Sequence, residues 1–474
     1  MNVVSLALLA VNTVKFPIIP TKYVMALYLV LIILLFVGVL LLKSKKIFLN
    51  ILGFISLVAP LVISIVGIYY ISNGYDAMGK IGSQTSETTT YGVYVMKTSD
   101  VKSVSDLLGS KVGISTKEET EKTNKVIEKI ESDMDSSLKA EKLDDATALV
   151  KSLYSDDVEA IVLNKAYIDV VKEVPDYKNF KKETRLLKEY KVKTKIDSKN
   201  AKTIKPGEPF VMYISGMDTW GHISVASRSD VNIIAVVNPK TNQILLVSTP
   251  RDYYVPLSIS NGSKDKLTHA GIYGIDVSMD TLSMLYGIDI DHYFKLNFSG
   301  FEGLIDAMDG ITVWSDYDFE VKPIKHYKVG NNKLTGLEAL AFARERHAFS
   351  GGDRQRGANQ MNVIQSVVQK MCSRALLKNY TKILDKCDGT FATDMSSEEI
   401  SAFVSYQLAN GNSWDIQKFS VSGSGKTAPV YSLSQNVYVM EPNMDDVAKA
   451  KELIQKVLSG KKVDLSTPEG GQAD

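Results

Sequence analysis

The sequence predicts an α/β protein carried on membrane helices, with a small globular domain followed by a larger one. Residues 1–71 contain two long apolar runs. Residues 91–195 alternate short apolar runs with polar helical stretches, and residues 206–459 contain longer β-branched runs and amphipathic segments. At 474 residues and 45% hydrophobic, the chain is long enough to bury more than one core.

Residues 1–71 are predicted to form a membrane anchor. Segments 22–42 and 47–71 are apolar and long enough to cross a bilayer. The short loop between them contains three lysines, Lys43, Lys45 and Lys46. Such loops stay in the cytoplasm, so we expect the chain after residue 71 to lie outside the cell. Whether residues 1–19 form a third, shorter span is left open.

Three further boundaries follow from composition. Residues 72–90 are rich in Gly, Ser and Thr and are predicted to be a flexible linker. Residues 91–195 have a βαβ-like rhythm and are interpreted as an accessory α/β domain. One part of it resembles half of a periplasmic solute-binding domain, but we favour a spacer or docking role. Residues 460–474 are predicted to be a flexible tail.

Charged residues follow the predicted strands of the large domain, residues 206–459. The apolar run FVMYIS leads to Asp218, Asp230 precedes the next run, and Arg251 and Asp252 follow the third. Because open α/β sheets gather ligand-binding groups at strand ends, this pattern predicts a polar ligand site at one edge of a sheet.

The stretch ARERHAFSGGDRQRGANQ, residues 343–360, contains four arginines: Arg344, Arg346, Arg354 and Arg356. The formal net charge of the whole chain is only +1, so this cluster serves a local target and not a nucleic-acid coat. Guanidinium groups donate paired hydrogen bonds to phosphate oxygens and do not lose their charge. Gln360 follows Arg356 by about one helical turn and shares its face. The stretch therefore predicts a phosphate site.

Several long motifs then appear in one order. The segments GMDTWG, SRSDVNIIAVVNPKTNQILLVSTPRD, DKLTHAGIYG, NFSGFEGLIDAMDGITV and ARER with GGDRQRGANQ resemble those of LytR-CpsA-Psr (LCP) proteins, in particular the capsule-associated CpsA-like branch of Gram-positive bacteria. This resemblance implies a three-layer α-β-α catalytic domain. It also implies transfer of a capsule polysaccharide or similar anionic glycopolymer from undecaprenyl diphosphate to peptidoglycan, with Mg²⁺ or Mn²⁺ bound.

The same motifs assign roles to single residues. The positions that match the family's diphosphate contacts are Arg251, Arg344, Arg346, Arg356 and Gln360. Asp218 and Asp230 match its magnesium ligands. Lys266 either contacts a phosphate or faces solvent. The general base is open: Asp252 is one candidate, whereas His347 has no Ser/His or His/Glu partner in the sequence.

Two other functions fit the same motifs, namely a non-catalytic membrane regulator and a prenyl-diphosphate phosphohydrolase. The expected partners are an undecaprenyl-diphosphate-linked polysaccharide, peptidoglycan and the membrane, with capsule polymerisation or export proteins as further candidates. Nucleic acid is not expected, since no groove-reading helix lies on the cytoplasmic side. The spacing of Cys372 and Cys387 argues against a zinc site and leaves a single disulfide open.

Overall fold

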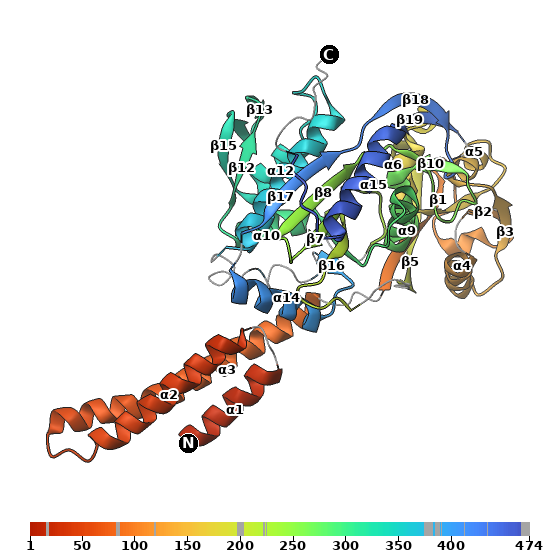
Figure 1. Ribbon diagram of the computed structural model, residues 1–474. Helices are drawn as coiled ribbons and strands as arrows, with labels where there is room; N and C mark the ends of the chain where they lie inside the picture. Colours follow the sequence, from red (N-terminus) through yellow and green to blue (C-terminus); the bar gives the residue numbers. More distant parts are fainter. Residues whose placement is uncertain are drawn as a thin grey trace.

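The computed structural model shows a rod of helices joined to a globular body that is built on two β-sheets (Figure 1). The residues it describes are 1–15, 19–81, 86–117, 120–196, 203–220, 223, 225–373, 383, 389, 391–411, 413–433 and 435–465. The N-terminus lies in the rod of helices, away from the globular body (Figure 1).

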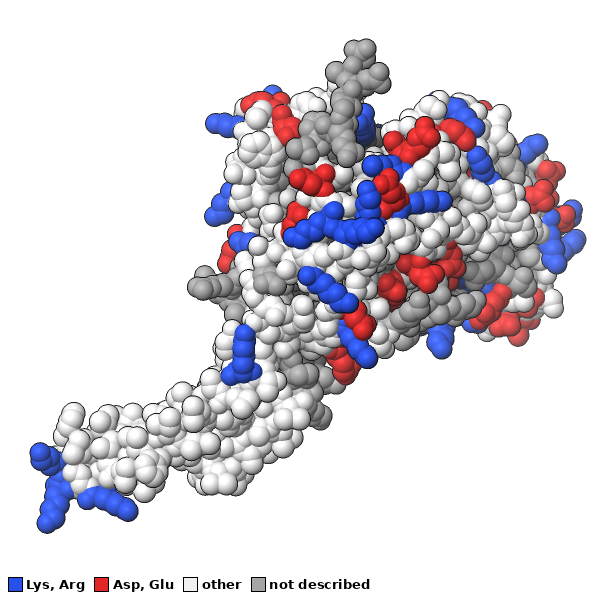
Figure 2. Space-filling model, in the orientation of Figure 1, with Lys and Arg blue, Asp and Glu red and all other residues white. Residues whose placement is uncertain are grey.

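The rod consists of three helices, α1 (Asn2–Lys15), α2 (Thr21–Leu41) and α3 (Ile47–Ile81). Two segments are long and apolar enough to cross a membrane, Thr21–Leu41 and Ile47–Asn73, as the sequence predicts. Figure 2 shows Lys and Arg side chains at the far end of the rod, where α2 turns into α3, and almost none along its length. The rod is therefore built as a membrane anchor.

Helix α1 is shorter than the other two. At 14 residues it is about 21 Å long, less than the roughly 30 Å hydrocarbon core of a bilayer. It packs along α3: the Asn2 side chain donates a hydrogen bond to the Leu57 carbonyl at 3.0 Å, and Leu9 is buried. Its length leaves the question of a third span open.

The structure corrects the flexible linker expected over residues 72–90. Helix α3 continues to Ile81, and strand β1 begins at Ser86. Thr89 and Thr90 are buried in that strand, opposite Val192 and Lys191 of β5. Threonine is β-branched and fits a pleated, half-buried surface, so a composition that suggested flexibility here forms regular structure.

The accessory domain, predicted over residues 91–195, contains a five-stranded sheet in the order β3-β2-β4-β1-β5. Strand β2 runs parallel to β3 and β4, which accounts for the βαβ-like rhythm of the sequence, whereas β1 is antiparallel to β4 and β5. The strands are β1 (Ser86–Met96), β2 (Lys111–Ser115), β3 (Lys139–Leu143), β4 (Ala160–Asn164) and β5 (Thr184–Lys195). The helices and 3-10 turns are η1 (Val104–Leu107), α4 (Thr120–Met134), α5 (Ala146–Tyr154), η2 (Lys165–Tyr167), α6 (Ile168–Val171), η3 (Pro175–Tyr177) and α7 (Phe180–Glu183).

The large domain is built on a six-stranded sheet in the order β16-β11-β6-β7-β8-β17. Its strands are β6 (Phe210–Met217), β7 (Ser229–Asn238), β8 (Gln243–Thr249), β11 (His292–Asn297), β16 (Phe391–Thr393) and β17 (Asp415–Ser420). Strands β7 and β8 form a hairpin and pair antiparallel up to Asn238 and Gln243 on either side of the turn.

Helices cover both faces of this sheet. On one face, Ile234 and Val247 pack against Leu282 of α9 (Ile275–Tyr286) and Val457 of α15 (Met444–Leu458). On the other face, Ile233 and Leu246 pack against Met361 of α12 (Asp353–Met371). Alternate residues of one strand thus enter opposite cores, and the domain has the expected three-layer α-β-α architecture.

The other elements of the large domain lie around this framework. Within the part of the large domain that the structure describes, the other helices are α8 (Leu267–Tyr273), α10 (Phe298–Ala307), α11 (Gly336–Arg344) and α14 (Ser397–Asn410). Four two-stranded ribbons are formed by β9 (Tyr254–Pro256) with β10 (Lys264–Lys266), β12 (Ile311–Ser315) with β15 (Gly330–Leu334), β13 (Phe319–Val321) with β14 (Lys325–Tyr327), and β18 (Gly423–Pro429) with β19 (Asn436–Pro442).

The C-terminal tail expected over residues 460–474 is anchored in its first part. The Gln243 side chain bonds both to the Val463 carbonyl, at 2.7 Å, and to the Val463 N–H, at 2.9 Å. Val463 itself is buried in the core beneath α15. Residues 466–474 lie outside the described residues.

The two domains share a hydrophobic core although their sheets are separate. One cluster of buried side chains contains Val170 and Phe180 of the accessory domain together with Ile272, Tyr273 and Val439 of the large domain. Backbone contacts continue this junction, since the Ala226 N–H donates to the Thr88 carbonyl at 3.0 Å. Because burial of apolar surface stabilises both parts at once, the accessory domain is fixed against the large one.

Candidate functional site

Four strand ends meet at one edge of the six-stranded sheet. The register pairs Met217 at the end of β6 with Ser229 at the start of β7 and with Asn297 at the end of parallel β11. It also pairs Asn232 of β7 with Thr249 at the end of β8. Consequently the predicted site residues that follow or begin these strands, Asp218, Asp230, Arg251 and Asp252, are placed at the same edge.

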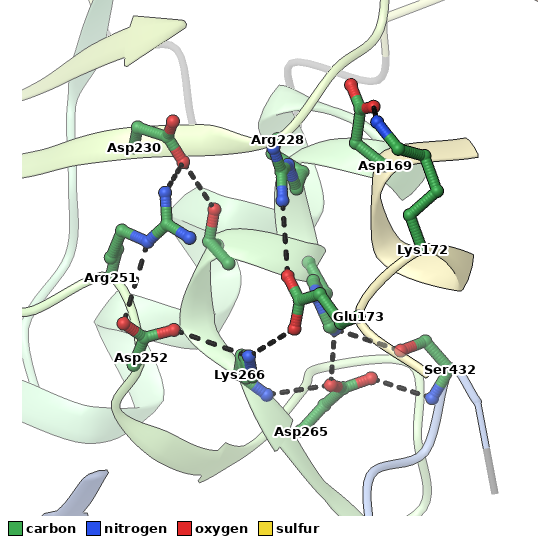
Figure 3. A network of polar contacts seen from close by, with 12 residues as sticks. Asp169, Lys172, Glu173, Arg228, Asp230, Arg251, Asp252, Asp265, Lys266 and Ser432 are labelled. Carbon is green, nitrogen blue, oxygen red and sulfur yellow. Dashed lines mark hydrogen bonds and ion pairs between the residues drawn. The ribbon is translucent and has the colours of Figure 1, made fainter. Parts of the chain in front are cut away.

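Asp230 and Arg251 form the centre of a polar network at this edge (Figure 3). An Arg251 guanidinium nitrogen lies 2.9 Å from the Asp230 carboxylate, and the Thr268 hydroxyl donates to the same oxygen at 3.1 Å. Arg251 also lies 3.5 Å from Asp252 through its Nε. All three charged side chains are largely buried, so their mutual orientation is fixed by charge-assisted contacts.

Lys266 extends the network and is only 4% exposed. Its ammonium nitrogen lies 3.5 Å from Asp252 and 2.7 Å from Glu173 (Figure 3). The sequence left open whether Lys266 faces solvent, and the structure places it inside the network. A buried ammonium needs such partners, since its desolvation is otherwise costly.

Two members of the network were missed by the sequence analysis. The Arg228 guanidinium lies 3.4 Å from the second oxygen of Glu173. Arg228 stands two residues before Asp230 within the SRSD motif, a signal that could have found it. Glu173 comes from the accessory domain and has no comparable signal. Burial acts to raise the pKa of Glu173, but the charges of Lys266 and Arg228 outweigh burial and lower the pKa below its ordinary value.

A buried cluster supports Lys266 from beneath. Asp265 accepts the Lys266 backbone N–H at 2.7 Å and lies 2.7 Å from Nδ1 of His269. The Ser432 hydroxyl lies 2.9 Å from the same His269 nitrogen. A nucleophilic relay uses the two ring nitrogens for different partners, whereas here serine and aspartate share one. The cluster is therefore structural and not a serine–histidine–aspartate triad.

Arg344, in the last turn of α11, lies at the end of β6, next to Asp218. Its guanidinium carbon is 4.3 Å from the ring centroid of Phe298, which begins α10, and one nitrogen is 3.6 Å from Asp218. A planar guanidinium over an aromatic face is held by a cation–π interaction that still leaves its edge available for hydrogen bonds. The structure thus brings Arg344 and the predicted metal ligand Asp218 together.

Arg346, Arg356 and Gln360 lie around the junction between α11 and α12. Arg346 follows α11, whereas Arg356 and Gln360 belong to α12. That helix begins at Asp353, directly after a turn at Gly352 with φ of 47°. Arg356 therefore lies in the first turn, where the helix dipole favours anions.

Two contacts hold the start of α12 against the rest of the site. The Gln360 amide donates to the Ala343 carbonyl of α11 at 3.4 Å. A Cβ atom on Gly357 would lie 3.4 Å from the hydroxyl of Ser248 near the end of β8, the strand that leads to Arg251. The close packing of α12 against β8 thus places the arginine stretch near the sheet edge that contains the polar network.

Asp218 and Asp230 flank the Met217–Ser229 pair and supply hard carboxylate oxygens. Among the residues that the structure describes, no group of three or more His, Cys, Asp or Glu side chains could hold a metal ion. Mg²⁺ in phosphate sites commonly takes one or two carboxylates and completes its shell with phosphate oxygens and water. The two aspartates fit such an ion and do not fit an all-protein metal cage.

Of the two cysteines, the structure describes only Cys372. Cys372 is a free thiol beyond the end of α12, and burial raises its pKa to about 11. Cys387 lies outside the described residues.

Comparison with known proteins identifies the family of this chain. A sequence model of the LytR_cpsA_psr family matches residues 174–456. The chain belongs to this family. The teichoic acid transferase TagU of Bacillus cereus, named as a polyisoprenyl-teichoic acid–peptidoglycan transferase, is 32% identical over 236 residues, which is 49% of this chain and 75% of TagU.

Two more relatives each cover about half of this chain. TagU of Enterococcus faecalis is 34% identical over 221 residues, 46% of this chain and 71% of that protein. The crystal structure of B. subtilis TagV, at 27% identity, covers 53% of this chain and 98% of its own, with a TM-score of 0.45.

Proposed function

We propose that this protein is a membrane-anchored transferase that moves an anionic glycopolymer from a polyprenyl diphosphate carrier to peptidoglycan. The observation that carries this proposal is the meeting of arginines and aspartates at one sheet edge, within residues 174–456 that match the LytR_cpsA_psr family. The TagU transferases, which are 32% and 34% identical to this chain, support it.

The reaction is a displacement at phosphorus. A peptidoglycan hydroxyl attacks the phosphorus that carries the sugar, and the bond to the bridging oxygen breaks. Prenyl phosphate leaves, and a phosphodiester joins the polymer to peptidoglycan. The protein needs to hold the two phosphates in line and to offset the charge that develops on the leaving group.

The arginines suit that task. Arg344 and Arg346 approach from the end of α11, Arg356 from the start of α12, and Arg251 from the end of β8. Their donors can engage non-bridging phosphate oxygens from several sides. Gln360 is a neutral donor on the same helix as Arg356. Asp252, in contact with Arg251, is the proposed acceptor of the hydroxyl proton.

Asp218 and Asp230 would hold a Mg²⁺ or Mn²⁺ ion, which supplies charge neutralisation to the diphosphate. In this arrangement both carboxylates contact arginine side chains, Arg344 and Arg251 respectively. The aspartates therefore also orient the guanidinium groups that face the phosphates.

We place the globular body outside the cell, on a multi-pass anchor. The lysine-rich loop between α2 and α3 supports this orientation. Helix α14 of the large domain contacts α3, and Lys22 at the start of α2 donates to the Ala409 carbonyl. The body thus lies against the end of the anchor, within reach of a carrier lipid in the same membrane (Figure 1).

The test is a transfer assay with full-length protein, a synthetic prenyl-diphosphate-linked glycan and peptidoglycan fragments, with Mg²⁺ present. We expect a glycan–peptidoglycan conjugate together with released prenyl phosphate. Free glycan phosphate without conjugate would mean a phosphohydrolase. Absence of turnover, together with absence of prenyl lipid in an organic extract of the purified protein, would favour a non-catalytic regulator.

A further inference from the structure

Glu173 is an accessory-domain residue whose carboxylate reaches the site of the large domain (Figure 3). One oxygen lies 2.7 Å from the Lys266 ammonium, and the other lies 3.4 Å from the Arg228 guanidinium. The residue stands directly before the region that matches the family, residues 174–456. A single carboxylate thus bridges two cations that approach from different segments of the large domain.

The backbone of Glu173 is fixed on the accessory side. Its N–H donates to the Val170 carbonyl at 3.0 Å, in the turn that follows α6. Val170 and Val171 are fully buried in the core that both domains share. The carboxylate therefore projects from a rigid turn and not from a loose loop.

The backbone of Lys266 is fixed to the same core. Helix α8 begins at the next residue and is buried along its whole length. Its residues Ala270, Ile272 and Tyr273 belong to the cluster that contains the two valines. Because one packed core anchors both partners, the separation of the two side chains is set by packing.

The contact between Glu173 and Lys266 fixes the direction of the lysine ammonium. An ammonium group has three N–H donors and a flexible stem, so it needs fixed acceptors to point in one direction. Glu173 accepts a hydrogen bond from the Lys266 ammonium at 2.7 Å, and Asp252 lies 3.5 Å from that ammonium as a second ion-pair partner. Asp252 also contacts Arg251, so the oriented ammonium lies within the network at the strand ends.

We propose that Glu173 is a positioning residue of the transferase site, which orients Lys266 and Arg228 toward the diphosphate of the donor. This proposal rests on the proposed function and names a new participant in it. It makes the accessory domain a contributor to the site, in place of the spacer or docking domain that the sequence suggested.

The test compares Glu173→Gln with a matched control, Glu121→Gln. Glu121 lies in the first turn of α4 and pairs with Lys125, and its side chain is 71% exposed. Glu173→Asp keeps the charge and serves as the conservative variant. The readouts are donor KM and kcat in the transfer assay, and the Kd of farnesyl diphosphate with Mg²⁺ measured by calorimetry.

We expect Glu173→Gln to raise the donor KM and the farnesyl diphosphate Kd about tenfold, because the cations then lose the group that orients them. The kcat should change by less than about threefold, since such contacts act on bound substrate and transition state alike. Glu173→Asp should recover most of the affinity, and Glu121→Gln should match the unmodified protein. A purely structural defect would instead reduce the active fraction, lowering kcat with KM unchanged.

Combining Glu173→Gln with Lys266→Gln gives a second, independent measurement. If Glu173 acts through Lys266, its substitution should add little once the lysine is gone; a full additional loss overturns the proposal. The proposal is also overturned by a Glu173→Gln protein that binds the donor as well as Glu121→Gln does, or more tightly. Tighter binding would mean that Glu173 competes with phosphate. If the unmodified protein neither transfers nor binds farnesyl diphosphate, the proposed function itself fails and this proposal fails with it.

Discussion

Glu87 of strand β1 and Lys295 of strand β11 form a buried ion pair that joins the accessory domain to the central sheet of the large domain. Their side chains are 9% and 6% exposed. The pair lies on the path by which the chain leaves the anchor and enters the globular body. Removing one partner would leave the other charge buried and uncompensated.

We therefore expect Lys295→Met to destabilise the protein by about 3–5 kcal/mol, whereas the double variant Glu87→Leu/Lys295→Met should recover most of that loss. Urea denaturation followed by tryptophan fluorescence measures both. Lys125→Met, which breaks the exposed pair with Glu121, is the control and should have little effect. A Lys295→Met protein as stable as this control would show that the pair does not fix the domains.

From the carboxylates around His292 we predict that the stability of the protein depends on pH. Its Nδ1 lies 3.3 Å from Asp394 and its Nε2 lies 3.7 Å from Glu399. Burial lowers the pKa of His292, but the hydrogen bond and charge of Asp394, with the charges of Glu399 and Asp291, outweigh burial and raise the pKa above its ordinary value.

A histidine whose pKa is raised by folding stabilises the protein fully below its unfolded pKa of about 6.5, and this contribution is lost as the pH rises through the folded pKa. We expect the free energy of unfolding to fall in that interval, and His292→Gln to remove the fall. Denaturation curves between pH 6 and 8.5 would show it. An identical slope in the variant would assign the pH dependence to other groups.

Substitutions of Arg356 distinguish oriented hydrogen bonding to the diphosphate from a simple effect of positive charge. If this guanidinium holds the diphosphate through paired planar donors, Arg356→Lys should lose transfer activity nearly as far as Arg356→Ala does. The measurement is the initial transfer rate at low and at physiological salt. A lysine variant that recovers most of the activity at low salt would show that the cluster acts only through its potential.

Asp230 tests the metal assignment. Asp230→Asn removes a hard anionic ligand while keeping a similar shape, so the Mg²⁺ concentration for half-maximal transfer should rise by about tenfold or more. Asp318→Asn, an exposed aspartate paired with His326, is the matched control. Unchanged Mg²⁺ dependence in Asp230→Asn would remove Asp230 from the proposed ligand set.

The orientation of the chain is tested by labelling. In a background with Cys372 and Cys387 replaced, a cysteine at exposed Ser137 of the accessory domain should react with an impermeant thiol reagent on wall-stripped cells. A cysteine at Ser44, in the loop between α2 and α3, should react only after permeabilisation. The reverse pattern would place the globular body in the cytoplasm.

The position of several site residues at one sheet edge could be predicted from local motifs. Asp218, Asp230 and Arg251 follow or begin apolar runs, and strand ends of one sheet meet at one edge whatever the details of packing. The environment of Lys266 could not be read in the same way. Its burial depends on Glu173 and Asp252, and one of these lies 93 positions away in the chain.

The errors share a physical cause. A Gly-, Ser- and Thr-rich stretch predicts flexibility when it is read alone, yet Thr89 and Thr90 are buried because β5, about one hundred residues later, supplies the partner strand. The same holds for Glu87 with Lys295 and for the core that joins the domains. Strand and ion-pair partners that are brought together only by tertiary packing cannot be recognised from the residue pattern of either segment alone.

The shared core also decides where this chain can be divided. A fragment limited to residues 174–456 would lose Val170 and Val171 together with the strands behind them, and would expose the apolar side chains of Ile272, Tyr273 and Val439 to water. Such a fragment should aggregate when expressed alone. For protein engineering, and for exchange of modules between relatives, the smallest transferable unit is therefore the pair of domains, with its outer boundary at the membrane and not at the start of the family match.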